Sequence, residues 1–258
     1  MIALEQHLRA RRDAGRKLFV PYMTGGFNDE WTAHVQAMAA GGADAIEIGI
    51  PFSDPVMDGP TIQQASEMAL LAGATPDSIL AELNGIDIDV PLVVMTYYNI
   101  AYRIGHQRFA ESLAAAGVSG TILPDLPLEE SGEWRVAAER AGVQHVLLAA
   151  PTAPDSRLPL ICQATRGFVY SVGLVGTTGE RSALAATAAP MARRLKAITD
   201  VPVIVGVGVS NGAQAAQVCQ EADGAVIASA LMRRVLDGAS PQDTEEFVRD
   251  IRSHIDAR

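Results

Sequence analysis

Residues 202–210 read Pro-Val-Ile-Val-Gly-Val-Gly-Val-Ser. The apolar, β-branched part of this run is typical of a strand buried in a parallel sheet. The residues that follow, Asn211–Glu221, have a helical period. A buried strand that leads directly into a helix is one βα unit, so we expect the same unit elsewhere in the chain.

Seven other short apolar runs alternate with Ala-rich and Arg/Glu-rich stretches of helical period. The eight expected strands are Leu18–Met23, Ala43–Ile48, Pro91–Tyr97, Gly120–Leu123, His145–Ala149, Gly167–Val172, Pro202–Val207 and Gly224–Ala228. Eight βα units in about 250 residues are what a closed parallel barrel requires, whereas a doubly wound open sheet has about five to seven strands. The sequence therefore predicts the α/β class and a single (β/α)8 TIM barrel, with residues 1–258 forming one domain.

Composition limits the possible partners. The chain has 258 residues, 48% of them hydrophobic, which is typical of a folded globular protein. Thirty acidic and 20 basic side chains give a formal charge of −10, which repels nucleic acid. The apolar stretches are shorter than a membrane span, and Met1–Ala10 carries charges where a signal peptide is apolar. We expect a cytoplasmic protein that binds neither nucleic acid nor a membrane.

The cysteines and histidines give no sign of a metal site. Cys162 and Cys219 form no Cys-x-x-Cys pair, and we expect both to be small buried hydrophobic residues. The five histidines are scattered, and no Ser or Cys lies in a recognisable nucleophile motif. Acid–base chemistry would therefore depend on carboxylates.

Glu47 is the first candidate, in a strand that reads Asp-Ala-Ile-Glu-Ile-Gly-Ile over residues 44–50. The side-chain period of two places the isoleucines on one face and Glu47 on the other. Because isoleucines suit the layer between sheet and helices, we expect Glu47 to point into the barrel. Loss of water there would raise its pKa and make it a usable general acid–base. The alternative is a buried Glu paired with Lys or Arg.

A second carboxylate, Asp58, lies in the loop Pro51–Pro60, whose three prolines restrict the backbone. Barrel active sites lie on the loops at the carboxyl ends of the strands, so Asp58 is suitably placed. Asp before Gly is also a common turn pair, and ordinary turn chemistry remains an equal alternative. Asp54, which precedes a proline, is expected to be a turn or surface residue.

The last two strands end in Gly208-Val209-Ser210 and Ala228-Ser229. We expect Ser210 and Ser229 to be the N-caps of helices over Asn211–Glu221 and Ala230–Asp237. In barrels this pair of loops often binds phosphate through backbone N–H groups and the helix dipole. Plain helix capping is the alternative.

The segment Gly173–Ser182 is too rich in Gly and Thr to pack as core. We expect a mobile lid over the site, with a plain surface loop as the alternative. Alternation along its strand places Tyr170 inward, where it could close a pocket with Tyr22 and Tyr97 or simply pack as aromatic core.

Two adjacent stretches carry a family resemblance. Residues 46–55 read Ile-Glu-Ile-Gly-Ile-Pro-Phe-Ser-Asp-Pro, and residues 58–63 read Asp-Gly-Pro-Thr-Ile-Gln. This long motif closely resembles the tryptophan synthase alpha chain family. The resemblance continues in order through Phe19–Thr24, Met95–Asn99, Pro124–Pro127, Gly176–Arg181, Gly206–Ser210 and Ala222–Leu231.

The resemblance implies a barrel lyase that cleaves indole-3-glycerol phosphate to indole and glyceraldehyde 3-phosphate by a retro-aldol reaction. It implies no cofactor in this chain and a beta chain partner, which uses pyridoxal phosphate to make L-tryptophan from indole and serine. The implied assembly is an alpha2beta2 heterotetramer.

By motif match, Glu47 is the acid–base glutamate and Asp58 the aspartate that meets the indole N–H. The implied substrate pocket contains Tyr22, Tyr97, Tyr170, Thr178 and Val207. The implied phosphate contacts are Gly179, Gly208, Ala228 and Ser229. The implied partner surface is the rim Pro51–Pro60, Tyr98–Ile100 and Asp125–Pro127, with Pro51, Asp54, Asn99 and Asp125 as contacts.

Some positions depart from the family pattern. Val207 stands where the family usually has Phe, Ala228 replaces Gly, Ile100 replaces Pro, and Phe27-Asn28 replaces Asp-Pro. These changes bear on substrate affinity and, at Ile100, on the partner surface.

Two other functions compete with the subunit of a two-component synthase. One is a free-standing lyase that releases indole without a partner. The other is an inactive chain that only activates a beta chain, and the presence of both Glu47 and Asp58 argues against it.

Overall fold

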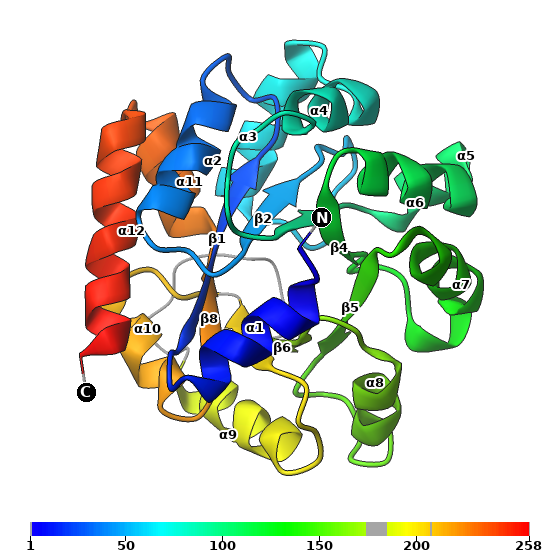
Figure 1. The fold of residues 1–258 in the computed structure, drawn as a ribbon, viewed down its shortest axis with the longest axis vertical. Helices are drawn as coiled ribbons and strands as arrows, with labels where there is room; N and C mark the ends of the chain where they lie inside the picture. The colour runs from blue at the N-terminus through cyan, green and yellow to red at the C-terminus, as the bar shows by residue number, and fades with distance from the viewer. Residues whose placement is uncertain (1, 174–184, 207, 258) are drawn as a thin grey trace.

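The structure is a computed structural model that describes residues 2–173, 185–206 and 208–257. Eight parallel strands follow chain order around a closed barrel, with β8 pairing back to β1 (Figure 1). The strands are β1 Leu18–Thr24, β2 Ile46–Gly49, β3 Leu92–Met95, β4 Val118–Ile122, β5 Gln144–Ala149, β6 Val169–Val172, β7 Val203–Gly206 and β8 Gly224–Ile227. The predicted (β/α)8 barrel is confirmed.

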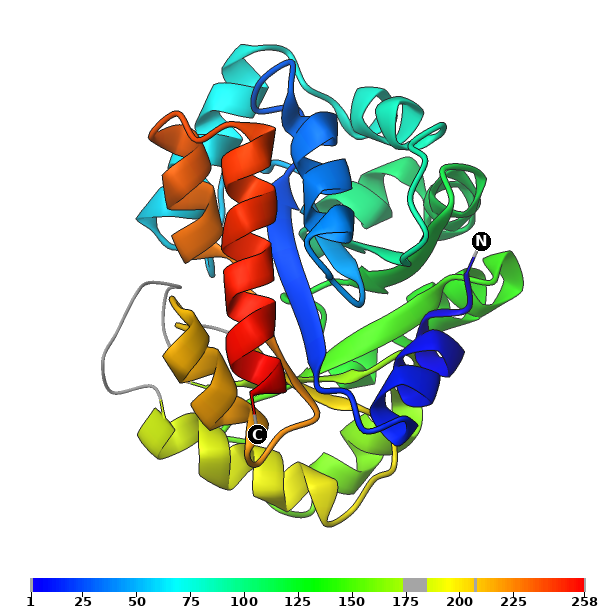
Figure 2. The ribbon, with the colours of Figure 1, turned by 60° about the vertical axis from the view of Figure 1, so that its left-hand side comes forward.

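Most helices surround the barrel and lie in the intervals between strands, whereas α1 precedes β1 and α11 and α12 follow β8. They are α1 Leu4–Asp13, α2 Trp31–Ala40, α3 Pro60–Leu71, α4 Pro76–Leu83, α5 Tyr98–Ile104, α6 His106–Ala115, η1 Leu128–Glu130, α7 Gly132–Ala141, α8 Leu158–Ala164, α9 Ala185–Lys196, α10 Gly212–Cys219, α11 Ser229–Leu236 and α12 Pro241–Asp256. The last helix, α12, packs against α2 and α10 on the outside of the barrel (Figure 2). Within the described part of the chain, no helix combines the length and apolarity that crossing a membrane requires.

Some strand ends agree with the predicted ones, and the others differ by one to three residues. Pro91 and Pro202 were expected inside strands but lie just before them, because proline has no N–H to donate to the ladder. Their carbonyls still accept hydrogen bonds, from Ile46 N at 3.0 Å and Val169 N at 2.8 Å. Local composition marks these strands, and pairing between neighbours sets their ends.

The barrel interior is a separate apolar core that α1 closes at one end. Leu4 and Leu8 of this helix are fully buried among inward residues of the strands. Gly120 and Gly167 leave room for Leu4, since a Cβ at either glycine would lie 2.7 Å from its Cδ2 atom. Because α1 precedes β1, it fills the amino-terminal end of the barrel and leaves the carboxyl ends of the strands for a site.

A buried carboxylate fastens the outer elements to the barrel. Asp44 is fully buried and accepts hydrogen bonds from Arg16 Nε at 2.7 Å and Arg252 Nη1 at 3.0 Å. It also accepts from the backbone N–H of Phe19 at 2.8 Å. Since Arg252 lies on α12, this cluster links the carboxyl-terminal helix to β1 and to the segment before β2.

Candidate active site

The two candidate carboxylates approach each other from one strand and from the loop after it. Glu47 lies on β2 between Tyr22 of β1 and Val93 of β3 in the strand register. The flanking Ile46 and Ile48 pack in the core between sheet and helices. Glu47 therefore points into the barrel, as the alternation of residues predicts.

Burial controls the protonation of Glu47. Its side chain is 1% exposed, and its Oε2 atom has no hydrogen-bond partner among the described residues. Loss of water, with a smaller contribution from the charge of Asp58, raises the pKa of Glu47 from 4.5 to about 8. The alternative of an ion pair finds no support, because no Lys or Arg of the described residues forms one with Glu47. At neutral pH this side chain can therefore hold a proton to donate.

Asp58 is held at the mouth of the barrel by Tyr97. The Tyr97 hydroxyl accepts from the backbone N–H of Met57 at 3.0 Å and is hydrogen-bonded to the Asp58 carboxylate. Phe52 stacks on the Tyr97 ring with centroids 5.0 Å apart. Burial raises the pKa of Asp58, and the hydrogen bond from Tyr97 opposes that rise. Of the two carboxylates, Glu47 has the stronger tendency to stay protonated.

Two further tyrosines complete the wall around the carboxylates. Burial raises the pKa of both Tyr22 and Tyr170 well above the ordinary value, and the charges of Asp58 and Glu47 add to the effect on each. Glycines make room for them: a Cβ at Gly49 would lie 1.9 Å from the Tyr22 hydroxyl, and one at Gly206 would lie 2.2 Å from that of Tyr170. The structure thus places Tyr22, Tyr97 and Tyr170 near the two carboxylates.

The expected N-caps at the ends of β7 and β8 are wrong by one residue. Asn211, not Ser210, caps α10, and its side chain accepts from Gln214 N at 3.0 Å. Helix α11 begins at Ser229 itself, with Ala228 at the N-cap and no side chain capping it. An Asx side chain replaces Ser at the first end. At the second end, no side chain of the described residues caps the free N–H groups of the first turn. That second end suits an anion better than plain capping would.

The structure describes only some of the remaining residues predicted for the phosphate site, the substrate pocket and the lid. Gly208 has φ +88°, in the left-handed region that favours glycine. Thr178, Gly179 and Val207 lie outside the described residues, as does most of the expected lid Gly173–Ser182.

The expected partner contacts lie along the same rim of the barrel. Pro51 is buried, whereas Asp54, Asn99 and Asp125 are exposed. Asp125 also has a structural task, since its carboxylate accepts from Tyr98 N at 2.8 Å where α5 begins.

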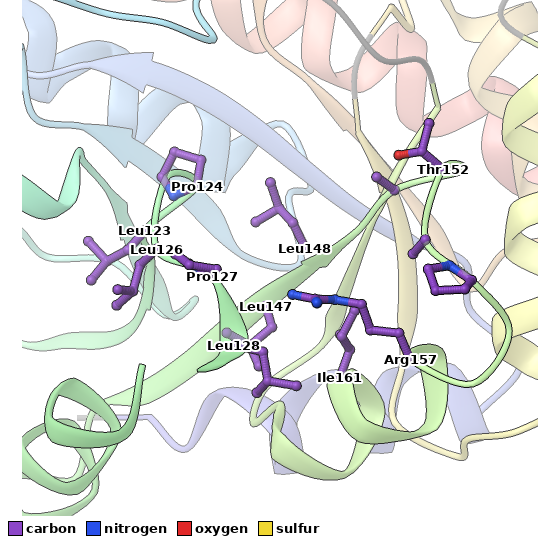
Figure 3. Close-up of a pocket in the computed structure, with 13 residues that line it drawn as sticks. Leu123, Pro124, Leu126, Pro127, Leu128, Leu147, Leu148, Thr152, Arg157 and Ile161 are labelled. Atoms are coloured by element: carbon purple, nitrogen blue, oxygen red, sulfur yellow. The ribbon is translucent and has the colours of Figure 1, made fainter. Parts of the chain in front are cut away.

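One cavity contains residues that the sequence reasoning did not single out. Figure 3 shows it between the segments that follow β4 and β5, with a volume of about 360 Å³. Leu123, Leu148 and Arg157 are among its lining residues. Leu148 also packs against the barrel interior, so the cavity adjoins the mouth of the barrel. The alternation of Val146 and Leu148 in β5 was a signal that could have placed Leu148 there.

No group of three or more His, Cys, Asp or Glu in the described ranges is arranged to hold a metal ion. What the described site offers is a protonatable carboxyl, a second carboxylate held by a phenol, and an uncapped helix end. This set can move protons on a bound molecule and hold an anionic group.

Comparisons with known proteins agree with the sequence resemblance. The family model for the tryptophan synthase alpha chain matches residues 8–256. The tryptophan synthase alpha chain of Thermobifida fusca is 43% identical over 263 residues, covering 100% of this chain and 97% of that protein. That of Streptomyces coelicolor is 41% identical, covering 98% and 94%.

Solved structures agree as well. A chain of Mycobacterium tuberculosis tryptophan synthase superimposes with a TM-score of 0.90 at 38% identity, covering 98% of this chain and 97% of that one. The tryptophan synthase alpha subunit of Legionella pneumophila gives 0.89 at 29% identity, covering 100% of both. A family model over nearly the whole chain, relatives above 40% identity and a shared barrel place this chain in the tryptophan synthase alpha chain family.

Proposed function

We propose that Glu47 and Asp58 are the catalytic residues of the lyase reaction of this family, the cleavage of indole-3-glycerol phosphate in tryptophan synthesis. One observation carries the proposal: a buried carboxyl, one oxygen of which has no hydrogen-bond partner among the described residues, lies beside a second carboxylate at the mouth of the barrel. Perturbed carboxylates in such a place are typical of acid–base catalysis.

The bond between indole C3 and the carbinol carbon breaks when three changes coincide. C3 gains a proton, the carbinol hydroxyl loses one, and the positive charge on the indole nitrogen is stabilised until the bonding electrons return to the ring. Glu47, protonated because burial raises its pKa to about 8, donates to C3. It then takes the hydroxyl proton as the aldehyde forms, so the proton count closes. Each such transfer contributes roughly 10²–10⁴ in rate.

Asp58 is suited to the indole nitrogen. Its hydrogen bond from Tyr97 favours the ionised form and fixes the carboxylate in place. An ionised carboxylate near the N–H favours the positive charge that protonation at C3 creates. The two roles follow from the different surroundings of the two groups.

The phosphate of the substrate is proposed to bind at Gly208, Ala228 and Ser229. The uncapped start of α11 supports this, because its N–H groups and the helix dipole attract an anion. By the family resemblance, Gly179 and Thr178 are proposed to join this site, and Val207 to line the indole pocket.

The partner of this family is a beta chain, which receives indole. We further propose an alpha2beta2 heterotetramer in which the rim carrying Asp54, Asn99 and Asp125 meets the beta chain. The exposure of these three polar side chains at one end of the barrel supports that surface. Pyridoxal phosphate is assigned to the beta chain, and the proton transfers here need only side chains.

Indole release from indole-3-glycerol phosphate by the purified chain, with and without a beta chain, tests the proposal. Glu47→Gln keeps the shape but cannot exchange a proton, so turnover should fall by at least 10²-fold. In the parent protein, kcat should decline as the pH rises through about 8, because Glu47 then loses the proton it must donate. Glu246→Gln, a change at an exposed position of α12, is the matched control. Cleavage by Glu47→Gln within threefold of the parent would show that the acid–base assignment is wrong.

A further inference from the structure

Helix α11 touches both halves of the proposed site. It begins at Ser229, where we place the phosphate, and packs against α3 and β1. Helix α3 begins at Pro60, two residues after Asp58. Helix α11, which would bind the phosphate, therefore adjoins α3, which follows the loop that carries Asp58.

Arg233 joins these two helices by side-chain hydrogen bonds. Its guanidinium donates to Thr61 Oγ1 at 2.7 Å and to Gln64 Oε1 at 3.2 Å. Both acceptors lie near the start of α3. A planar guanidinium that holds two acceptors fixes orientation as well as distance.

The start of α3 is in turn bound to the loop that carries Asp58. Gln63 Nε2 donates to the carbonyl oxygen of Asp58 at 2.7 Å, and Gln63 N donates to the carbonyl of Gly59 at 3.0 Å. A displacement of the first turn of α3 therefore displaces the backbone of Asp58.

Two observations distinguish Arg233 from an ordinary surface arginine. Over residues 2–173, 185–206 and 208–257 it forms no ion pair, and both of its hydrogen-bond acceptors are neutral.

The neighbouring residue Met232 makes a second link from the same helix, because its sulfur accepts a hydrogen bond from Thr24 N at 3.5 Å. Thr24 Oγ1 lies 3.2 Å from the hydroxyl of Tyr22, one of the tyrosines near the two carboxylates. The same turn of α11 thus contacts β1 next to Tyr22 as well as the start of α3.

We infer that Arg233 is a positioning residue that couples phosphate binding at the start of α11 to the placement of Asp58. The inference rests on the phosphate site of the proposed function. Binding of the substrate phosphate holds α11, Arg233 holds the first turn of α3, and Gln63 holds Asp58. Binding energy from the part of the substrate that does not react is thereby used at the part that does.

The first test compares Arg233→Met with Arg234→Met in the indole-release assay. Methionine keeps an apolar stem and removes the donors. Arg234 is the matched control, because it is on the same helix but lies over the Phe247 ring, 4.6 Å from its centroid. For Arg233→Met we expect kcat to fall roughly tenfold with KM within about threefold, since a misplacement of 1 Å can cost about 10²-fold in rate. Arg233→Lys should recover part of kcat, and Arg234→Met should match the parent.

The second test measures coupling directly, by hydrogen exchange with and without inorganic phosphate. In the parent, phosphate should slow exchange at the start of α11 and in residues 57–66. In Arg233→Met the protection of α11 should remain and that of residues 57–66 should disappear.

The outcomes distinguish a failure of the coupling through Arg233 from a failure of the phosphate site at the start of α11. Phosphate that protects α11 of the parent but leaves residues 57–66 unchanged would overturn the coupling alone. Phosphate that leaves α11 unprotected would overturn the phosphate site, and the coupling with it. Equal kcat for Arg233→Met and Arg234→Met would also refute the role of Arg233.

Discussion

Replacing Glu47 by Gln should stabilise the folded protein above about pH 5 while it abolishes turnover. In the unfolded chain Glu47 ionises near 4.5, whereas in the native state burial raises its pKa to about 8. Between these values only the unfolded chain has lost the proton. Each pH unit in that window therefore lowers the free energy of unfolding by about 1.4 kcal/mol.

The magnitude follows from the two pKa values. Over the window from 4.5 to about 8 the native state of the parent loses about 4–5 kcal/mol from this one group. That is a large part of a typical free energy of unfolding of about 5–15 kcal/mol. Glutamine does not ionise, so Glu47→Gln escapes this loss. Asp58 is present in both proteins, and the difference between them isolates Glu47.

Urea unfolding of the parent and of Glu47→Gln at several values from pH 5 to pH 8 measures the effect. The difference in free energy of unfolding, variant minus parent, should increase by about 1.4 kcal/mol per pH unit and level off above about pH 8. Glu246→Gln removes an exposed carboxylate instead, so its free energy of unfolding should change with pH in parallel with that of the parent. A difference between Glu47→Gln and the parent that stays constant across this range would refute the claim that native Glu47 keeps its proton.

Three other changes test the packing at Gly206, the buried Asp44 cluster and the proposed partner surface. Gly206→Ala should destabilise the fold by about 1–3 kcal/mol in urea unfolding, because its Cβ would lie 2.2 Å from the Tyr170 hydroxyl, and the same change should cost less in a Tyr170→Ala background, which lacks the clashing ring. Asp44→Ala should lower the free energy of unfolding by about 3–5 kcal/mol, since it leaves buried arginine and amide donors without their carboxylate, and an unchanged urea midpoint would contradict this. Asp54→Ala should reduce stimulation by the beta chain more than basal indole release, whereas Asp58→Ala should reduce both, and equal effects of Asp54→Ala on the two rates would remove it from the partner surface.

Particular elements show how far sequence reasoning reached. The barrel was predicted from eight apolar runs separated by helical stretches, and the structure confirms it. The helix caps at Ser210 and Ser229 were wrong by one residue, because several neighbouring residues can cap and only the backbone path chooses among them. The hydrogen bond that holds Asp58 to Tyr97 was not predicted, because the two residues lie on different βα loops.

The sequence by itself determined that Glu47 faces away from the isoleucines beside it. Side-chain direction along a strand is a local property with a period of two, so it can be read without knowing the neighbours. Only the tertiary structure decided what Glu47 meets there. Three features depend on how the eight strands close and exclude water: the Oε2 atom without a hydrogen-bond partner in the described part of the chain, the pKa of about 8, and the nearby charge of Asp58. Desolvation and Coulomb energy depend on distances in space, and the closing of the barrel sets those distances.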